Sequence, residues 1–161
     1  MNKVRIGVAG ANGAFGSKHL DALSQIDTVE IVAAMATTLE KANGVADQYS
    51  IPNRFDNYGD MLGLTDLDAV ILATPTQIHA EQGLKAMAAG KHVLIEIPMA
   101  DTLADSEALV AKQKESGLRR WGKAEEGRGG GKEKGKKERA RRNAKQKKKE
   151  IVTTKREEQK E

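Results

Sequence analysis

Apolar residues in the first 118 positions of the chain follow two spacings. Short β-branched runs are typical of strands, whereas apolar residues that recur about every three or four positions predict helices. The runs that predict strands are 3–9, 29–36, 69–73 and 92–96, with a short extended segment at 54–55. The stretches with helical spacing are 14–26, 39–49, 78–89 and 103–116, with a helical turn at 58–64. Gly90 and Gly117 end the last two helices, and Thr102, followed by Asp105, is a predicted N-terminal cap.

The alternation of strands and helices predicts an α/β fold with a doubly wound parallel sheet. The run 69–73 reads Ala-Val-Ile-Leu-Ala, which is typical of a strand covered on both faces. Sheets of this kind bind ligands at the carboxyl ends of their strands. The positions to examine for function are therefore 10–16, 36–38, 74–76 and 96–98.

The turn after the first predicted strand is rich in glycine. It reads Gly10-Ala11-Asn12-Gly13-Ala14-Phe15-Gly16, a G-x-x-G-x-x-G spacing rather than G-x-G-x-x-G. Because it follows a strand and opens a helix, these glycines would allow a tight turn and a close approach of the backbone to a pyrophosphate. The alternative is an ordinary glycine-rich turn without a ligand.

The end of the second predicted strand bears on the choice of cofactor. Dinucleotide folds that prefer NAD usually carry Asp or Glu there to bind the ribose 2′-hydroxyl. This chain has Thr37 and Thr38 instead, so we expect NADP. The two threonines are also suited to capping the next helix, and the two roles are compatible. No Arg follows the strand, which leaves NAD as the alternative.

The end of the predicted strand 69–73 also carries polar residues. Thr74, Pro75 and Thr76 form a predicted turn that opens the helix containing His79. His79 lies near the positive end of that helix, where it would either bond a cofactor or substrate or pack the helix end. His19 and His92 are interpreted as structural. The chain has no Cys, and isolated histidines do not make a metal site, so neither a metal ligand nor a catalytic residue is assigned.

Charge divides the chain into two parts. Residues 1–118 hold 9 Lys+Arg and 15 Asp+Glu, whereas residues 119–161 hold 18 and 8 and few apolar side chains. The sequence thus predicts a globular domain over 1–118 and a disordered basic tail over 119–161. Lys, Arg, Glu and Gly, each of which can be encoded by codons made only of purines, dominate that tail, so a frame change is one origin for it. A non-specific nucleic-acid-binding arm is the other interpretation. With no apolar run near the ~20 residues of a membrane helix, we expect a cytoplasmic protein.

Two stretches carry a resemblance to a known family. Residues 73–81 (Ala-Thr-Pro-Thr-Gln-Ile-His-Ala-Glu) and 89–98 (Ala-Gly-Lys-His-Val-Leu-Ile-Glu-Ile-Pro), with the glycine turn, resemble the glucose–fructose oxidoreductase, inositol dehydrogenase and rhizopine catabolism (GFO/IDH/MocA) family. The resemblance covers residues 3 to about 118 and implies the NAD(P)-binding Rossmann domain of an oxidoreductase. It also implies that His79 and residues 96–98 face the nicotinamide side of the cofactor.

One motif departs from the family pattern. The family usually has Glu-Lys-Pro where this chain has Glu96, Ile97 and Pro98. This variant resembles a branch that uses NADP to oxidise a semialdehyde from aromatic breakdown in its cyclic hemiacetal form. Family members continue into a sixth strand and a second α+β domain, which supplies the substrate pocket, a catalytic histidine and the homo-oligomer interface. Because the sequence shows neither, we expect this chain to bind cofactor weakly and to be inactive alone.

Overall fold

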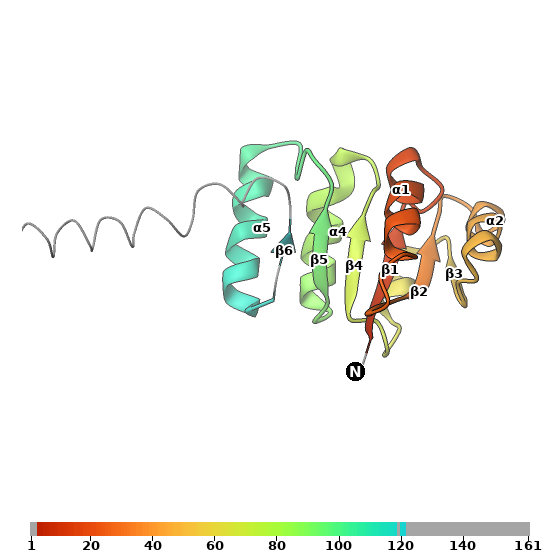
Figure 1. Cartoon of the computed structure of the whole chain (residues 1–161). Coiled ribbons are helices and arrows are strands. Elements are labelled where there is room, and N and C mark those ends of the chain that lie inside the picture. Colours follow the sequence, from red (N-terminus) through yellow and green to blue (C-terminus); the bar gives the residue numbers. More distant parts are fainter. Residues whose placement is uncertain (1–2, 119, 122–161) are drawn as a thin grey trace, which may run out of the picture. The chain divides into compact units, whose positions relative to one another are not determined.

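The computed structural model describes residues 3–118 and 120–121 as a parallel sheet flanked by helices (Figure 1). The strands are Val4–Ala9 (β1), Val29–Met35 (β2), Asn53–Phe55 (β3), Ala69–Leu72 (β4), His92–Ile95 (β5) and Arg120–Trp121 (β6). The helices are Ala14–Leu23 (α1), Leu39–Tyr49 (α2), Tyr58–Leu62 (α3), Thr76–Ala88 (α4) and Leu103–Ser116 (α5). The sheet order is β3-β2-β1-β4-β5-β6 and every pairing is parallel, which confirms the doubly wound α/β fold.

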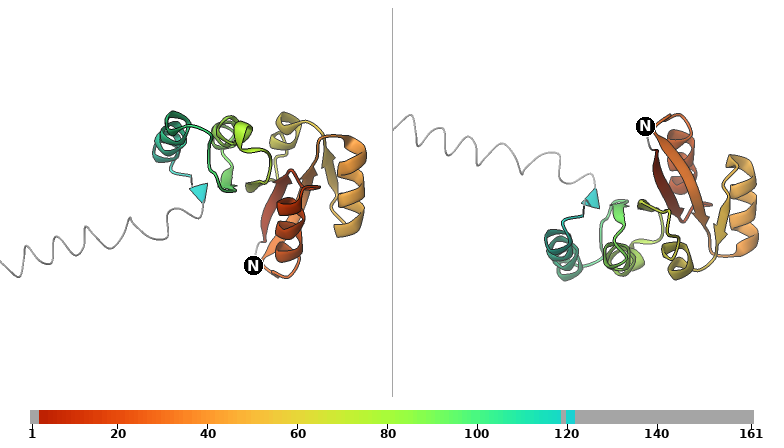
Figure 2. Two further views of the ribbon diagram at one scale, coloured as in Figure 1. Left: turned by 90° about the horizontal axis from the view of Figure 1, so that it is seen from above. Right: turned by 90° about the horizontal axis from the view of Figure 1, so that it is seen from below.

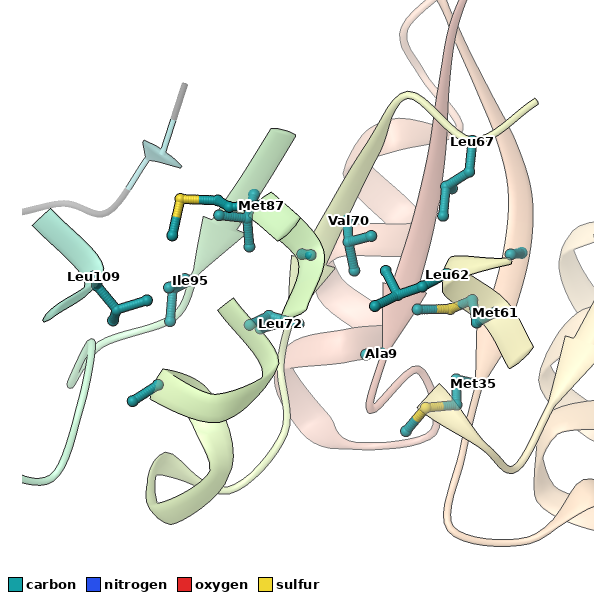
Figure 3. Close-up of a cluster of buried hydrophobic side chains, with 14 of the residues drawn as sticks. Ala9, Met35, Met61, Leu62, Leu67, Val70, Leu72, Met87, Ile95 and Leu109 are labelled. Atoms are coloured by element: carbon teal, nitrogen blue, oxygen red, sulfur yellow. The ribbon is translucent and has the colours of Figure 1, made fainter. Parts of the chain in front are cut away.

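Strand β4 shows why the sheet has a helical layer on each side. Val70 and Leu72 are buried in a cluster with side chains of α3, α4 and α5, whereas Ile71 is buried in a second cluster with side chains of α1 and α2. Successive side chains of a strand point to opposite faces, so an apolar run such as β4 needs cover on both. Figure 2 shows these layers, and Figure 3 shows the first cluster, with Met61 of α3 and Leu109 of α5.

Local signals fix most helix ends where the sequence predicts them. The Oγ1 of Thr102 accepts a bond from the backbone N–H of Asp105 at 3.1 Å, as predicted for the start of α5. Gly90, with φ of +74°, ends α4: its N–H donates to the carbonyl of Met87, and the N–H of Lys91 donates to that of Ala86. These two bonds define a Schellman motif, whose left-handed position favours glycine.

Several helix ends differ from the prediction, and the reason can be seen at the end of α1 and at the start of α4. Helix α1 ends at Leu23 rather than Ile26, because the N–H of Ile26 bonds the carbonyl three residues back and the chain tightens into turns. Helix α4 begins at Thr76 rather than Ile78, because Pro75 is its extended N-cap residue with φ of −60° and ψ of 142°. A proline at this point loses nothing by lacking an N–H, since the first turn of a helix leaves that group unpaired.

The edge of the sheet corrects a second expectation. The sequence predicts no sixth strand, yet Arg120 and Trp121 pair in parallel with Val93 and Leu94 of β5. A strand of two residues carries no periodicity, so apolar spacing could not reveal it. It lies just beyond the boundary expected at Leu118, and the compact unit to which it belongs runs from Met1 to Lys123. The basic clusters of the expected tail lie outside the described residues. Within residues 3–118 and 120–121, none of the helices could cross a membrane.

Candidate functional site

The loops that follow β1, β2, β4 and β5 meet at one edge of the sheet. The N–H of Ala73 donates to the carbonyl of Ala9 at 2.9 Å, and the N–H of Glu96 donates to that of Leu72 at 3.1 Å. The N–H groups of Gly10 and Ala11 both donate to the carbonyl of Met35, at 3.0 and 2.9 Å. The four segments chosen from the sequence therefore lie side by side, as the carboxyl ends of neighbouring parallel strands must.

Two glycines of the first turn are required by the protein itself. Gly10 has a φ of +79°, and a Cβ there would lie 2.5 Å from the carbonyl oxygen of Ala73. A Cβ on Gly16 would lie 2.1 Å from the carbonyl oxygen of Gly10, inside the contact between α1 and the turn. Both distances are shorter than any real Cβ contact. These two positions would be glycine for reasons of packing, whether or not a ligand binds.

Gly13 has a different environment. A Cβ there would meet only the carbonyl oxygen of Gly10, at 3.2 Å, and that of Ala73, at 3.9 Å, and its φ of −78° suits any residue. Gly13 is also the N-cap of α1, where no side chain bonds the first-turn N–H groups and no acidic residue lies in the first turn. Unpaired N–H groups and the positive end of the helix attract an anion. The N-terminus of α1 at Gly13 is therefore a candidate position for an anion such as a phosphate.

The end of β2 combines two hydroxyls with a cation. The Oγ1 of Thr38 caps α2 by accepting from the N–H of Lys41 at 3.3 Å, as the sequence predicts. The ammonium group of the same lysine lies 3.4 Å from the Oγ1 of Thr37. Lys41 was not among the predicted residues, because the cation expected after this strand was an arginine. The feature that could have identified Lys41 is its position in the first turn of α2. This turn follows directly after the end of β2.

Hydrogen bonds with α4 and α3 hold the loop after β4 in place. Thr74 donates its hydroxyl to the Oε1 of Gln82 at 2.6 Å, and the carbonyl of Gln82 accepts from the hydroxyl of Tyr58 at 2.9 Å. Burial raises the pKa of Tyr58 well above its ordinary value, so this phenol stays protonated and able to donate. The chain of contacts fixes Thr74 against α4 and leaves Pro75 and Thr76 at the start of that helix.

His79 joins two of the four loops. Its side chain is 1% exposed, with Nε2 lying 2.7 Å from the carbonyl oxygen of Thr74 and Nδ1 lying 2.9 Å from that of Pro98. Carbonyl oxygens only accept, so the ring donates to them from whichever nitrogen carries a proton. Both ring nitrogens therefore face backbone carbonyls, and the cofactor contact of His79 stays a prediction.

His19 has a partner that its place in α1 did not suggest. Its Nε2 lies 2.7 Å from the Oε1 of Glu96, the first residue after β5. His19, predicted to be structural, lies three residues after Gly16 and so within one helical turn of the glycine turn. The residue next to Glu96, Ile97, is 58% exposed at the same edge. Among the described residues, no group of three or more His, Asp or Glu is placed to hold a metal ion.

Several known proteins are similar to this chain in sequence or fold. The chain is 51% identical over 115 residues to the 4-carboxy-2-hydroxymuconate-6-semialdehyde dehydrogenase of Sphingobium sp., over 71% of this chain and 36% of that one. It is 27% identical to an NADP(+) scyllo-inositol 2-dehydrogenase of Bacillus subtilis, over 71% of this chain and 35% of the relative. Among solved structures, the 3-ketoreductase KijD10 of Actinomadura kijaniata, crystallised with NADP and TDP-benzene, matches with a TM-score of 0.71 and 30% identity, over 75% of this chain and 38% of KijD10.

These relatives are much longer than the part they share with this chain, which spans about a third of the length of the two curated ones. The family described as oxidoreductases with an NAD-binding Rossmann fold matches residues 4–122, and so includes all four loops of the site. The match covers most of the sequence and agrees with the resemblance carried by the motifs at 10–16, 73–81 and 89–98. The chain therefore belongs to the GFO/IDH/MocA family of oxidoreductases and contains its NAD(P)-binding Rossmann domain.

Proposed function

We propose that this chain is the cofactor-binding part of an NADP-dependent oxidoreductase, with the cofactor held by residues 10–16, 37–38, 74–76 and 96–98. The observation that carries this proposal is the N-terminus of α1, where Gly13 leaves both space and unpaired N–H groups for a diphosphate. When bound, the nicotinamide ring accepts a hydride from the substrate carbon. The residues of this chain bind the cofactor and orient it.

The preference for NADP rests on the end of β2. This strand ends in Met35 without a carboxylate that would repel a 2′-phosphate. The two threonine hydroxyls and the ammonium group of Lys41 lie there together, with 3.4 Å between Lys41 Nζ and Thr37 Oγ1. A charge-assisted hydrogen bond contributes about 1.5–3 kcal/mol, so Lys41 alone would favour the phosphorylated cofactor by about tenfold or more.

We propose a substrate class from the residues after β5 and from the relative that is 51% identical. The substrate is an aldehyde that reacts as its cyclic hemiacetal, such as 4-carboxy-2-hydroxymuconate semialdehyde, which would be oxidised to 2-pyrone-4,6-dicarboxylate. Ile97 cannot move a proton, so the base that takes the hydroxyl proton comes from another group. We assign that base to the part of the longer relatives that this chain does not match. We therefore expect the chain alone to show no turnover.

We propose that His79 supports the site indirectly. Both of its ring nitrogens lie against backbone carbonyls and so do not face the cofactor. Because the ring lies between the carbonyls of Thr74 and Pro98, it fixes the distance between the loops after β4 and β5. We propose that these loops contact the nicotinamide half of the cofactor and that His79 acts through them. A histidine in this place is a positioning residue.

A fluorescence titration of the full chain with NADPH and with NADH tests the proposal. We expect both to bind, NADPH more tightly, and Lys41→Ala to weaken NADPH about tenfold or more with little effect on NADH. Lys85→Ala is the matched control, because Lys85 lies in the last turn of α4 and pairs with the exposed Glu81. Failure of both nucleotides to bind would contradict the proposed function, and equal loss of both in Lys41→Ala would contradict the role of Lys41.

A further inference from the structure

Two buried polar side chains of α4 hold one residue of the cofactor edge. Within residues 3–118, the buried polar side chains are those of His79 and Gln82, which are 1% and 7% exposed. His79 Nε2 lies 2.7 Å from the carbonyl oxygen of Thr74, and Gln82 Oε1 accepts from the hydroxyl of the same threonine at 2.6 Å. Burial of a polar group costs free energy unless that group is bonded. The bonds to Thr74, with the contact between His79 and Pro98, account for both burials.

The hydroxyl of Thr74 has a single proton, which it donates to Gln82. A hydroxyl oxygen also has two acceptor positions, and this bond uses neither of them. Toward any further partner, the oxygen of Thr74 is therefore an acceptor only. A hydroxyl that donates in one bond is also a stronger acceptor in the next, because the two bonds polarise each other. Gln82 thus prepares this oxygen for a hydrogen-bond donor rather than for a phosphate oxygen, which itself only accepts.

The positions of Gln82 and Thr74 are fixed by neighbouring elements. The backbone carbonyl of Gln82 accepts from the hydroxyl of Tyr58 in α3 at 2.9 Å. Thr74 lies against the glycine turn, because a Cβ on Gly10 would lie 3.0 Å from its backbone nitrogen. Thr74 is half-buried, so part of it stays accessible to a ligand. The contacts therefore connect α3, through α4, to a residue beside the glycine turn.

We propose that Gln82 is a positioning residue, which presents the Oγ1 of Thr74 as a hydrogen-bond acceptor to the nicotinamide half of the cofactor. The inference rests on the proposed function, which puts that half of NADPH beside the loops after β4 and β5. The hydrogen-bond donors of that half are the N–H groups of the carboxamide and the hydroxyl groups of the attached ribose. Gln82 acts on them through Thr74 and does not contact the cofactor itself.

The experiment compares three ligands that share the phosphorylated adenosine half. NADPH carries the whole nicotinamide half, 2′,5′-ADP lacks it, and 2′-phospho-ADP-ribose lacks only the nicotinamide ring. Fluorescence titration of the full chain with NADPH, with the other two as competitors, gives the three dissociation constants. Partial unfolding of a variant leaves their ratios unchanged, because it divides all affinities by the same folded fraction. The ratio of the dissociation constants, 2′,5′-ADP over NADPH, therefore reports contacts with the nicotinamide half.

Substitutions at the two positions separate the acceptor role from a packing role. Thr74→Val removes the hydroxyl and should lower the ratio about 2- to 10-fold, the range of one neutral hydrogen bond. In Gln82→Met the thioether accepts only weakly, so the hydroxyl loses its orientation and the ratio should fall about 2- to 5-fold. The double variant should fall no further than Thr74→Val alone, because Gln82 acts through that hydroxyl.

Two further variants complete the set. Gln82→Glu keeps an accepting oxygen in either protonation state, so its ratio should stay near that of the parent. Gln25→Met is the matched control, because the amide of Gln25 also bonds a hydroxyl, that of Ser24 at 3.2 Å, in the exposed turn after α1. The control should follow the parent. In Thr74→Val, weaker binding of 2′-phospho-ADP-ribose would identify a ribose hydroxyl as the donor, and its unchanged binding would identify the carboxamide.

The outcomes distinguish this inference from the proposed function. If Gln82→Met leaves the ratio unchanged or raises it, Thr74 does not depend on Gln82 as an acceptor. The role of Gln82 is likewise refuted if the double variant falls below Thr74→Val, or if Gln82→Glu behaves like Gln82→Met. In each of these cases the proposed function stands, because the parent still binds NADPH. If neither NADPH nor 2′,5′-ADP binds to the parent, the proposed function fails, and this inference fails with it.

Discussion

Gly13→Ala separates what the protein needs from what a ligand needs in the glycine turn. Gly10 and Gly16 are fixed by contacts below 3.0 Å, so substitutions there disturb the fold and binding together. The Cβ of an alanine at position 13 would approach the carbonyl oxygen of Gly10 to only 3.2 Å. The backbone at this position has ordinary negative φ, so the substitution introduces no conformational strain.

The expected cost of Gly13→Ala in stability is small. A contact of 3.2 Å is relieved by a shift of a few tenths of an ångström, and the new methyl group otherwise faces open space. We expect the free energy of unfolding to fall by about 1 kcal/mol or less, the low end of what overpacking costs. Gly13 is the N-cap of α1, and glycine is preferred over alanine at this position, so the loss of that preference is part of the expected cost.

The expected cost in binding is much larger. The methyl group would narrow the space at the N-cap of α1, where, under the proposed function, a phosphate approaches the first-turn N–H groups within hydrogen-bond distance. Loss of one hydrogen bond to a charged group costs about 1.5–3 kcal/mol. Since about 1.4 kcal/mol is tenfold, the dissociation constant for NADPH should rise about 10- to 150-fold.

The assay measures both quantities on the full chain: urea unfolding for stability, and quenching or enhancement of NADPH fluorescence for binding. Gly44→Ala is the control, because a Cβ at Gly44 in the middle of α2 would meet nothing within 4 Å. It should raise stability by about 0.5–1 kcal/mol, the usual gain from replacing a glycine inside a helix, and leave binding unchanged. A folded Gly13→Ala variant that binds NADPH as tightly as the parent would refute the argument that this missing side chain makes room for phosphate.

The core and the opposite edge of the sheet give three further tests. Leu109→Ala should cost about 2–5 kcal/mol in urea unfolding, because this side chain is fully buried between α4 and β5. Gly83→Ala should cost about 1–3 kcal/mol, because its Cβ would lie 2.7 Å from Leu109 Cδ2, and the double variant should cost less than the sum. Side-chain and backbone hydrogen bonds from Arg5 lower the pKa of Asp68. The stabilisation that they give the folded state is therefore present above the unfolded pKa of about 3.9 and is lost in stronger acid. In Asp68→Asn, the free energy of unfolding should fall less steeply with acid than in the parent.

The architecture was predictable because its signals are local or dictated by chirality. The apolar run 69–73 indicated a strand covered on both faces, and β4 has that cover from two separate clusters. Helices α2 and α5 have the predicted bounds because Thr38 and Thr102 cap them within a single turn. Strand β6 was not predictable, since two residues paired with β5 carry no pattern of their own.

The backbone of the site was predictable for a related reason. Right-handed crossovers between parallel strands must bring the segments after β1, β2, β4 and β5 to one edge, whatever side chains they carry. In the glycine turn, the spacing of the glycines by itself indicated the geometry of the backbone. Lys41 escaped notice because its ammonium group reaches Thr37 from the next helix, four positions along the chain.

The contacts of two histidines could not be predicted from the sequence. His79 lies near a helix N-terminus at the ligand edge, a position that suits a ligand contact and a packing role equally well, and only the carbonyls at 2.9 and 2.7 Å from its two nitrogens distinguish them. His19 and Glu96 are 77 positions apart, so no periodicity or motif spacing relates them, and their 2.7 Å contact exists only because α1 reaches across to the end of β5. Each histidine thereby connects the loop after β5 to a different element, His79 from α4 and His19 from α1. Under the proposed function, a change at either histidine should therefore alter NADPH affinity in the fluorescence titration, even though the glycine turn itself is untouched.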